Sequence, residues 1–300
     1  AFYPETQGDP EYPDLKGLRL DGVDLIHQWQ HEHPDGQFVW NTQGFDAIET
    51  QSTGPLLALF EPGHMQYEVD RSKDPSGEPS LTEMVTKAID VLAERGDQGY
   101  VLVVESGRID HAHHANNAWR ALTDTIEFAR AIKAATEKID LDETLVIVTA
   151  DHAHALTFDG YGERGNPIMG YAINPQRGED GDGIMRDHLK RPMTVLNYAN
   201  GPGFRRDDSE IDYRQMDPLD TEYKQNAGHW QYSATHAGED VPVYAIGASS
   251  EVVYGVIEQN VLFHMIVAAH PALEAAVADL TGSEGKLPPY PLPEKTSSDS

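Results

Sequence analysis

The sequence predicts an α/β protein with a mainly parallel sheet that is sandwiched by helices. Two continuous apolar runs, residues 99–104 and 144–149, predict strands that are buried on both faces. A long helical stretch, from about His111 to Lys138, separates them. A strand–helix–strand unit of this kind forms parallel strands with a right-handed crossover. Both strands should therefore end at the same edge of one sheet.

The segment before these strands predicts four further elements. Residues 1–17 are an irregular Pro- and Gly-rich stretch, and residues 18–30 predict a helix. Residues 56–60 predict a short buried strand, and residues 81–94 an amphipathic helix. Asp21 or Asp24 stands early in the first helix. The second helix opens with a capping box, in which Ser80 and Glu83 each satisfy a backbone N–H of the other.

The remainder of the chain is less regular. Residues 155–235 are rich in Gly, Pro and charge, with strand-like pieces such as residues 194–198, and predict a decorated loop region over the active edge. Residues 241–246 predict a strand and residues 256–269 a terminal helix. We expect one domain over residues 1–287, followed by a flexible tail at residues 288–300.

Length and charge exclude several classes of protein. None of the apolar runs in the 300 residues reaches the ~20 residues that span a bilayer. Fifty acidic residues against 22 basic ones give a formal charge of −28, which excludes a nucleic-acid partner because such a partner requires a basic patch. Two explanations of the charge remain open: a highly solvated surface, or adaptation to high salt, where counterions screen self-repulsion.

Cysteine is absent from the sequence. This excludes disulfides, thiol catalysis and zinc sites that use cysteine. The sequence shows no signal peptide, but it begins with Ala1 rather than Met. The lack of a signal peptide therefore says little about the cellular compartment.

Asp110 and His114 are the first candidate metal ligands. They are spaced i, i+4 near the start of the expected helix, which places both side chains on one helical face. Carboxylate oxygen and imidazole nitrogen are both good zinc ligands. For this pair alone, an acid at a helix start with a surface histidine is an equally good explanation.

Asp151 and His152 directly follow the second strand. Within a strand, neighbouring side chains face opposite sides, so both reach one metal only where the strand has ended. The alternative is an aspartate at a strand-to-loop turn. His154 is placed to orient a metal ligand by hydrogen bonding.

Glu105 ends the first strand and supplies the hard oxygen that Mg²⁺ prefers. A buried glutamate in this position is costly unless it is paired or metal-bound. Ligands of open α/β sheets sit outside the carboxyl ends of strands, so Glu105 and Asp151 should meet there, with His236 as a further candidate. Two zinc ions ~3.5–4 Å apart can clamp the attacking and leaving oxygens of a phosphoryl transfer.

Three motifs in this order resemble the alkaline phosphatase family. They are VESGRIDHAHH at residues 104–114, VTADHAH at 148–154 and THAGEDV at 235–241. DPEYP at residues 9–13, RLDG at 19–22 and LFEPG at 59–63 resemble the branch that includes the animal enzymes. The resemblance runs from residue 1 to about residue 270.

The resemblance implies a role for each candidate. Asp110, His114 and His236 would hold a first zinc ion, and Asp151 and His152 a second. Glu105 would bind magnesium, and His111 would lie near the phosphate. A possible structural calcium ion would be held by the Phe60 carbonyl, Glu61 and Glu78, with Asp74 as a rival to Glu78.

The family's nucleophile is a serine in an Asp-Ser-Ala type motif upstream of these segments. The sequence offers no convincing counterpart, since Asp208-Ser209 lacks the small residues that should follow. We therefore expect the chain to be the C-terminal, larger part of an alkaline phosphatase. The first strands of the sheet, the nucleophile segment and several metal ligands would lie on a missing N-terminal part.

The resemblance implies hydrolysis of phosphate monoesters through a phosphoserine intermediate, in a periplasmic or secreted homodimer. Two alternatives remain: a related metal-dependent phosphodiesterase or sulfatase, or an inactive metal-binding fragment that acts as an interaction module.

Overall fold

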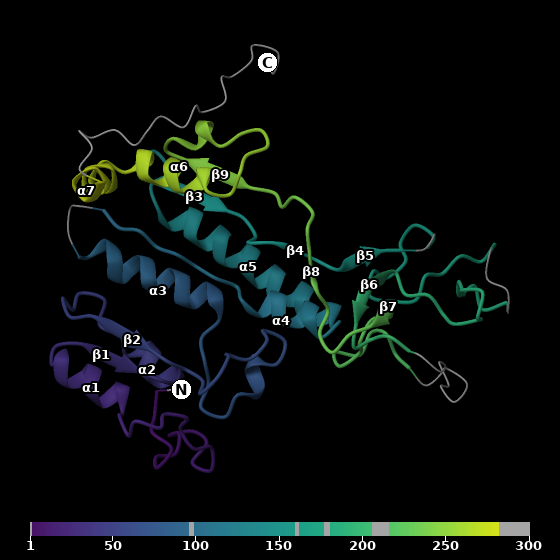
Figure 1. The fold of residues 1–300 in the computed structure, drawn as a ribbon, viewed down its shortest axis with the longest axis horizontal. Helices are drawn as coiled ribbons and strands as arrows, with labels where there is room; N and C mark the ends of the chain where they lie inside the picture. Colours follow the sequence, from purple (N-terminus) through teal and green to yellow (C-terminus); the bar gives the residue numbers. More distant parts are fainter. Residues whose placement is uncertain (1, 96–98, 160–161, 177–180, 206–215, 282–300) are drawn as a thin grey trace. The chain divides into compact units, whose positions relative to one another are not determined.

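The computed structural model describes residues 2–95, 99–159, 162–176, 181–205 and 216–281 (Figure 1). The chain forms two compact units. The first unit comprises residues 1–96, 100–135 and 154–238, and the second comprises residues 97–99, 136–153 and 239–300. The expected tail at residues 288–300 lies outside the described residues.

The first unit opens with α1 (Leu25–Glu32), which begins later than the sequence predicts. The carboxylate of Asp24 accepts the N–H groups of Ile26 and His27 and thereby caps the helix. Gly22, at φ 73°, lies in a turn before it. Asp24 rather than Asp21 is therefore the start signal, because a capping side chain must reach N–H groups two and three residues ahead.

A small parallel sheet and two helices surround the first core. Strand β1 (Gln37–Val39) pairs with β2 (Leu56–Ala58), which confirms the predicted strand near residues 56–60. Helix α2 (Thr42–Asp46) lies between them in the chain, and a 3₁₀ turn, η1 (Arg71–Lys73), follows. The buried core side chains are those of Val39, Phe45, Ile48, Phe60 and Val91.

Helix α3 (Leu81–Ala93) confirms the predicted capping box. The N–H of Glu83 donates to the Ser80 hydroxyl at 3.2 Å, and the N–H of Ser80 donates to the Glu83 carboxylate at 2.7 Å. Glu127 adds an acceptor from another helix, 3.0 Å from the N–H of Thr82. The first turn of α3 is thus anchored by acceptors from its own chain segment and from a distant one.

The strand predicted at residues 99–104 does not form. The segment is extended between α3 and the next helix (Figure 1), but the described residues provide it with no hydrogen-bonded neighbour. Val101 is 54 % exposed and Val103 is 87 % exposed, so the expected burial on both faces is also wrong. A β-propensity alone does not produce a strand, because a strand is defined by pairing.

The helix predicted over residues 111–138 is two helices. Helix α4 (Arg108–His114) ends at Ala115, and α5 (Ala118–Lys138) begins after Asn117. Asn116, between them, adopts φ 56° and is fully buried. The left-handed conformation interrupts the helix, and asparagine is one of the few residues that tolerate it.

Residues 155–235 contain a mixed three-stranded sheet. Strand β6 (Leu196–Gly201) pairs antiparallel with β5 (Leu156–Phe158) and parallel with β7 (Ala227–Trp230). Leu196 and Tyr198 of β6 pack against Ala118 of α5 and against Ala234 in a second core. Strands β4 (Ala153–His154) and β8 (His236–Ala237) form a short pair.

The second unit contains β3 (Leu145–Val148), as predicted from residues 144–149. Its described partner is β9 (Tyr244–Gly247), and the pairing is antiparallel, so the expected parallel strand–helix–strand unit is not seen. The 3₁₀ turn η3 (Ser250–Val252) is followed by α6 (Val261–Ala269) and α7 (Pro271–Thr281). Helix α6 begins later than predicted, and the sequence analysis did not predict α7.

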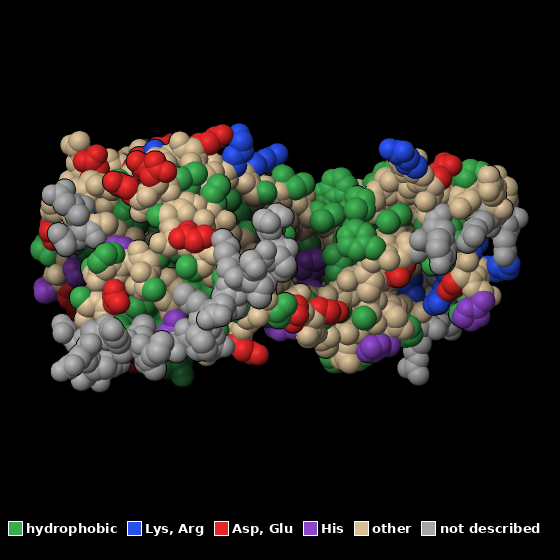
Figure 2. Space-filling view, turned by 90° about the horizontal axis from the view of Figure 1, so that it is seen from above, with side chains coloured by type: hydrophobic (Ala, Val, Ile, Leu, Met, Phe, Trp, Pro, Cys, Tyr) green, Lys and Arg blue, Asp and Glu red, His purple; other side chains and the backbone are tan. Residues whose placement is uncertain are grey.

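The described residues have mixed α/β content, as predicted, but their sheets are small and of both orientations rather than mainly parallel. The described helices include none that is long and apolar enough to cross a membrane. Acidic side chains lie at separate places on the visible face instead of forming one patch (Figure 2). This spread matches the distribution of acids along the sequence.

Candidate metal centre

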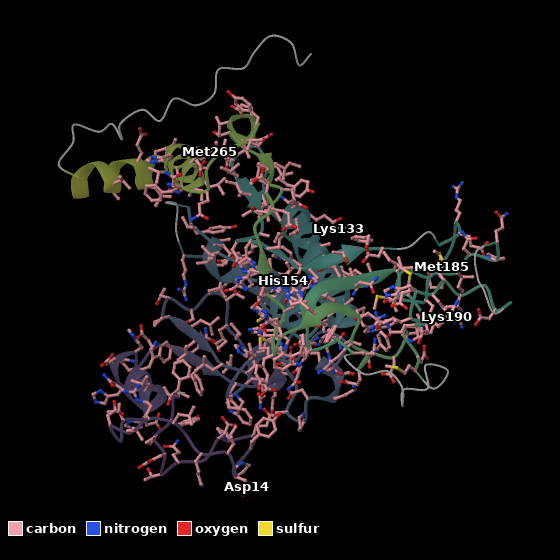
Figure 3. All side chains as sticks on the ribbon, turned by 45° about the vertical axis from the view of Figure 1, so that its right-hand side comes forward. Asp14, Lys133, His154, Met185, Lys190 and Met265 are labelled. Atoms are coloured by element: carbon pink, nitrogen blue, oxygen red, sulfur yellow. The ribbon has the colours of Figure 1, made fainter. Side chains whose placement is uncertain are left out.

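Four side chains of the first unit converge on one point. Asp110, His114, His154 and His236 each offer one ligand atom, and these atoms lie within 4.8 Å of one another. Asp110 and His114 come from one face of α4, His154 from β4 and His236 from β8. Figure 3 labels His154 among the side chains drawn on the ribbon.

The hydrogen bond of His114 orients its ring for metal binding. Its Nδ1 lies 2.5 Å from the carbonyl oxygen of Ala234, so Nδ1 carries the proton and Nε2 carries a lone pair. That Nε2 lies 3.2 Å from Nε2 of His236 and 3.3 Å from Oδ2 of Asp110. The three potential ligand atoms therefore face one another.

Asp110 is the only acid of this four-residue group. Its Oδ1 lies 2.8 Å from Nε2 of His154 and 3.3 Å from Nε2 of His236. Burial pushes the pKa of Asp110 upward, but the hydrogen bond from His154 and the nearby imidazoles outweigh it, so the net pKa is lowered. Burial also lowers the pKa of His154. An ionised carboxylate is the form in which an aspartate binds a metal ion.

His113 of α4 lies beside the centre, with its ring 5.0 Å from that of His154. Its Nδ1 lies 2.9 Å from the hydroxyl of Tyr198, a buried residue of β6. Burial, assisted by His154, lowers the pKa of His113 to about 4. The sequence analysis did not assign His113 a role. Residues 111–114 contain three histidines, and the sequence does not show which of the three rings is buried.

Asp151 and His152 belong to the second unit, directly after β3. Oδ2 of Asp151 lies 3.2 Å from Nε2 of His152, so the pair offers its ligand atoms together. Nδ1 of His152 lies 3.1 Å from the carbonyl oxygen of Ala153, an arrangement that leaves Nε2 for a ligand when Nδ1 carries the proton. Strand β3 ends at Val148, so both residues lie beyond the strand, as the sequence analysis expects.

Glu105 and His111 lie outside the four-residue group. Glu105 is exposed, so the expectation of a buried glutamate is wrong for the described structure; the strand that should bury it does not form. The ring of His111 lies 4.2 Å from that of His64, and its Nδ1 is 3.2 Å from Nη1 of Arg108. Burial, with the charge of His64, lowers the pKa of His111.

A second cluster consists only of carboxylates. Glu11, Glu61 and Asp74 place one oxygen each within 4.8 Å of one another. Glu61 was predicted, Asp74 was the rival candidate, and Glu11 was missed although it lies in the DPEYP motif. Glu78 lies outside this group of three, but it is only 3 % exposed, and burial raises its pKa to about 7.

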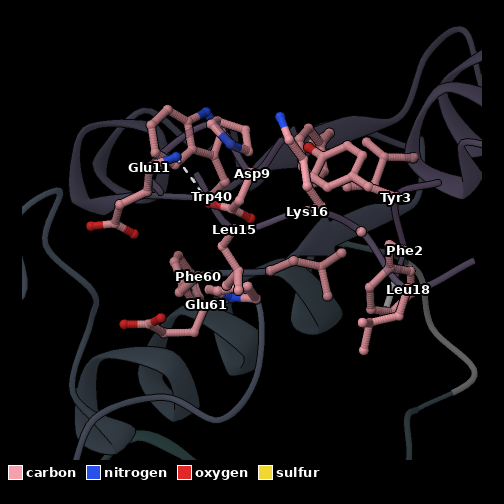
Figure 4. A pocket seen from close by; sticks show the side chains of 16 residues that line it. Phe2, Tyr3, Asp9, Glu11, Leu15, Lys16, Leu18, Trp40, Phe60 and Glu61 are labelled. Carbon is pink, nitrogen blue, oxygen red and sulfur yellow. Dashed lines mark hydrogen bonds between the residues drawn. The ribbon is translucent and has the colours of Figure 1, made fainter. Parts of the chain in front are cut away.

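These acids leave oxygen atoms without partners. Oε2 of Glu11, Oδ2 of Asp74 and Oε2 of Glu78 are buried, and none accepts a hydrogen bond from the residues that the structure describes. Glu11 and Glu61 line a pocket together with Phe60, and their carboxylates lie at the same end of it (Figure 4). Buried acceptors of this kind are costly unless a cation neutralises them. An all-oxygen donor set fits a hard ion such as Ca²⁺.

The first group fits a different ion. One carboxylate and three imidazoles form a nitrogen and oxygen donor set that is typical of zinc. Ser209, rejected above as a nucleophile together with Asp208, lies outside the described residues.

Comparisons with known proteins agree with these motifs. The chain is 38 % identical over 275 residues to the tissue-nonspecific isozyme of alkaline phosphatase from Homo sapiens, covering 89 % of the chain and 50 % of the relative. It is 36 % identical over 279 residues to alkaline phosphatase from Gadus morhua, covering 89 % of the chain and 55 % of the relative. The chain thus spans about half the length of these curated relatives.

The fold has a solved counterpart. The structure of alkaline phosphatase from the Antarctic bacterium TAB5 matches with a TM-score of 0.51 at 20 % identity, covering 84 % of this chain and 56 % of that one. The sequence profile described as "Alkaline phosphatase" matches residues 1–271. The chain therefore belongs to the alkaline phosphatase family.

Proposed function

We propose that the chain provides zinc-binding residues of an enzyme that hydrolyses phosphate monoesters. The observation that carries this proposal is the convergence of Asp110, His114, His154 and His236 within 4.8 Å in a chain of this family. Because the chain spans about half the length of its relatives, the activity is proposed for the whole protein of which these residues form a part.

Each metal-binding role rests on the chemistry of the donors. Asp110, His114 and His236 are proposed to hold the first zinc ion, while His154 orients Asp110 through the 2.8 Å contact. Asp151 and His152 are proposed for a second zinc ion, and Glu105 for magnesium. A bound zinc ion would supply Lewis-acid stabilisation of negative charge on the phosphoryl group.

His111 is proposed to lie on the phosphate side of the centre. It directly follows Asp110, and its lowered pKa keeps the ring neutral at neutral pH. A neutral ring can donate one N–H to a phosphate oxygen or to a water molecule that contacts it. The nucleophile is proposed to be a serine, as the family resemblance implies, so that the reaction proceeds through a phosphoserine.

The carboxylate cluster is proposed to hold a structural calcium ion. Glu11, Glu61 and Asp74 provide the oxygens, and the Phe60 carbonyl is the further donor implied by the family. Glu78 lies close enough that, besides burial, the charges of Glu61 and Asp74 raise its pKa. The site would join segments of the chain that are distant in sequence. By family analogy we also propose a periplasmic or secreted homodimer.

Substrate comparison tests the proposed reaction. We expect turnover of p-nitrophenyl phosphate to exceed that of bis(p-nitrophenyl) phosphate and of p-nitrophenyl sulfate. Faster turnover of the diester or the sulfate would favour the phosphodiesterase or sulfatase alternative. Zinc binding without turnover of any of the three would favour the metal-binding interaction module.

A further inference from the structure

Asn200, at the end of β6, contacts the residue that precedes a proposed zinc ligand. Its Oδ1 accepts the N–H of Thr235 at 2.9 Å, and its Nδ2 donates to the Thr235 hydroxyl at 2.9 Å. Thr235 is followed directly by His236. Asn200 is only 6 % exposed, whereas Thr235 and His236 are both exposed. A buried amide therefore anchors an exposed segment that carries a ligand.

The same asparagine is linked to the helix that carries the other ligands. Its backbone carbonyl accepts a hydrogen bond from Nδ2 of Asn116 at 3.1 Å. Asn116 is fully buried, and its Oδ1 accepts the N–H of Gly203 at 2.8 Å. It stands two residues after His114, at the break between α4 and α5.

The two ligand segments also touch directly. The N–H of Ala234 donates to the carbonyl oxygen of His114 at 2.9 Å, and His114 Nδ1 contacts the Ala234 carbonyl. Segment 234–236 is thus held at Ala234 by α4 and at Thr235 by Asn200. Two consecutive anchors leave the backbone little freedom at His236.

We propose that Asn200 is a positioning residue for the first zinc site, one that holds His236 at the correct distance from His114. This inference rests on the zinc site proposed above. An amide suits the task, because Thr235 presents one donor and one acceptor, and an asparagine side chain offers the complement of both. Since Asn200 is buried, loss of its side chain is not compensated fully by water.

Asn197 provides a matched control on the same strand. Its Nδ2 donates to the carbonyl oxygen of Thr194 at 2.7 Å, and its Oδ1 accepts from the Thr194 hydroxyl at 2.8 Å. This is again an asparagine–threonine pair with two hydrogen bonds. Both hydrogen bonds join Asn197 to Thr194 and reach neither α4 nor segment 234–236, so removal of the side chain should affect stability without affecting the metal.

The test is the zinc affinity of the purified protein, measured by competition with a chelator. Asn200→Ala should weaken zinc binding at the first site about 10–100-fold, which is the usual effect of removing a group that supports a ligand. Asn197→Ala should leave it unchanged. Asn200→Asp keeps the acceptor for the Thr235 N–H and offers a second acceptor to the Thr235 hydroxyl in place of the amide donor, so it should recover part of the affinity. With Co²⁺ in place of zinc, the visible absorption spectrum should change for Asn200→Ala and not for Asn197→Ala.

Thr235→Val provides a second route if Asn200→Ala does not fold, because it removes only the hydroxyl; it should also weaken zinc binding. Unchanged zinc affinity and an unchanged Co²⁺ spectrum in the folded variants would overturn the positioning role. Asp110→Asn separates this failure from a failure of the site itself. If Asp110→Asn leaves zinc binding intact, the assignment of the first zinc site is wrong, and the positioning role of Asn200 is overturned with it.

Discussion

At the scale of single residues, the candidate centre depends on which nitrogen of each imidazole is available. His114 directs Nδ1 to a backbone carbonyl and Nε2 toward Asp110 and His236. This orientation is imposed by Ala234, a residue that has no metal-binding chemistry of its own. The sequence predicts Asp110, His114 and His236 as ligands, but it contains no local signal for the carbonyl that selects the tautomer.

Removal of His236 should abolish the first zinc site. His236→Ala takes away one of the proposed ligands, so we expect the complete enzyme to lose activity by orders of magnitude and to bind less zinc. His27→Ala, an exposed histidine on α1, is the control and should have no effect on either quantity. Zinc content by mass spectrometry and turnover of p-nitrophenyl phosphate measure both. An unchanged zinc content would contradict the ligand assignment.

Asp124 should make the protein less stable as the pH rises. Burial raises its pKa to about 6, although the N–H of Glu68 donates to it at 3.2 Å. The folded state therefore binds a proton more tightly than the unfolded state, whose carboxyl titrates near its ordinary value. The contribution of Asp124 to the free energy of unfolding is present at low pH and is lost as the pH rises from about 4 to about 6.

Asp124→Asn should remove that dependence. The variant should gain on the order of 3 kcal/mol relative to the wild type between pH ~4 and ~7, because the asparagine keeps an acceptor for Glu68 without a charge. Urea unfolding across this range measures the difference. The exposed Asp142→Asn is the control. A constant difference between Asp124→Asn and wild type at all pH values would refute the explanation.

At the scale of elements, the sequence predicts the helices and caps that depend on neighbouring residues. It fails for the elements that depend on partners distant in sequence. The capping box of α3 is correct because Ser80 and Glu83 satisfy each other. The prediction of a strand at residues 99–104 is wrong, because a strand needs a neighbouring strand to pair with and the apolar pattern carries no information about one. The break at Asn116 was missed, since its buried amide is satisfied by Asn200 and Gly203, far away in sequence.

Calcium should stabilise the elements around the carboxylate cluster. Glu11, Glu61 and Asp74 come from three separate segments of the first unit, so a bound ion would link them. We expect millimolar Ca²⁺ to raise the melting temperature; at 100 times the dissociation constant, the gain would be about 2.7 kcal/mol.

The control for this experiment separates binding from general ion effects. Glu61→Gln should eliminate the response to Ca²⁺, while Asp46→Asn, at an exposed position of α2, should retain it. An equal response of all three proteins would show that calcium does not act through the cluster.

At the scale of the whole molecule, each of the two units carries its own set of proposed metal ligands. Asp110, His114, His154 and His236 belong to the first unit, and Asp151 and His152 to the second. The three motifs identify all six residues in the sequence. The family match over residues 1–271 includes both sets of residues.

The net charge of −28 should make the stability of the whole chain depend on salt. Fifty acids repel one another in the compact state, and this repulsion is screened as the Debye length falls from about 10 Å at 0.1 M salt to about 3 Å at 1 M. The unfolded chain is more expanded and gains less from screening. If the composition reflects adaptation to high salt, NaCl should raise the melting temperature by several degrees over this range.

The shape of the salt response identifies its cause. Screening should produce most of the gain below about 1 M and should be the same for NaCl and KCl, because it depends on ionic strength. Exclusion of solutes from the surface should instead give a gain that continues to increase with concentration, and sucrose, which is uncharged, should reproduce it. No gain with either salt would leave a highly solvated surface as the explanation of the charge.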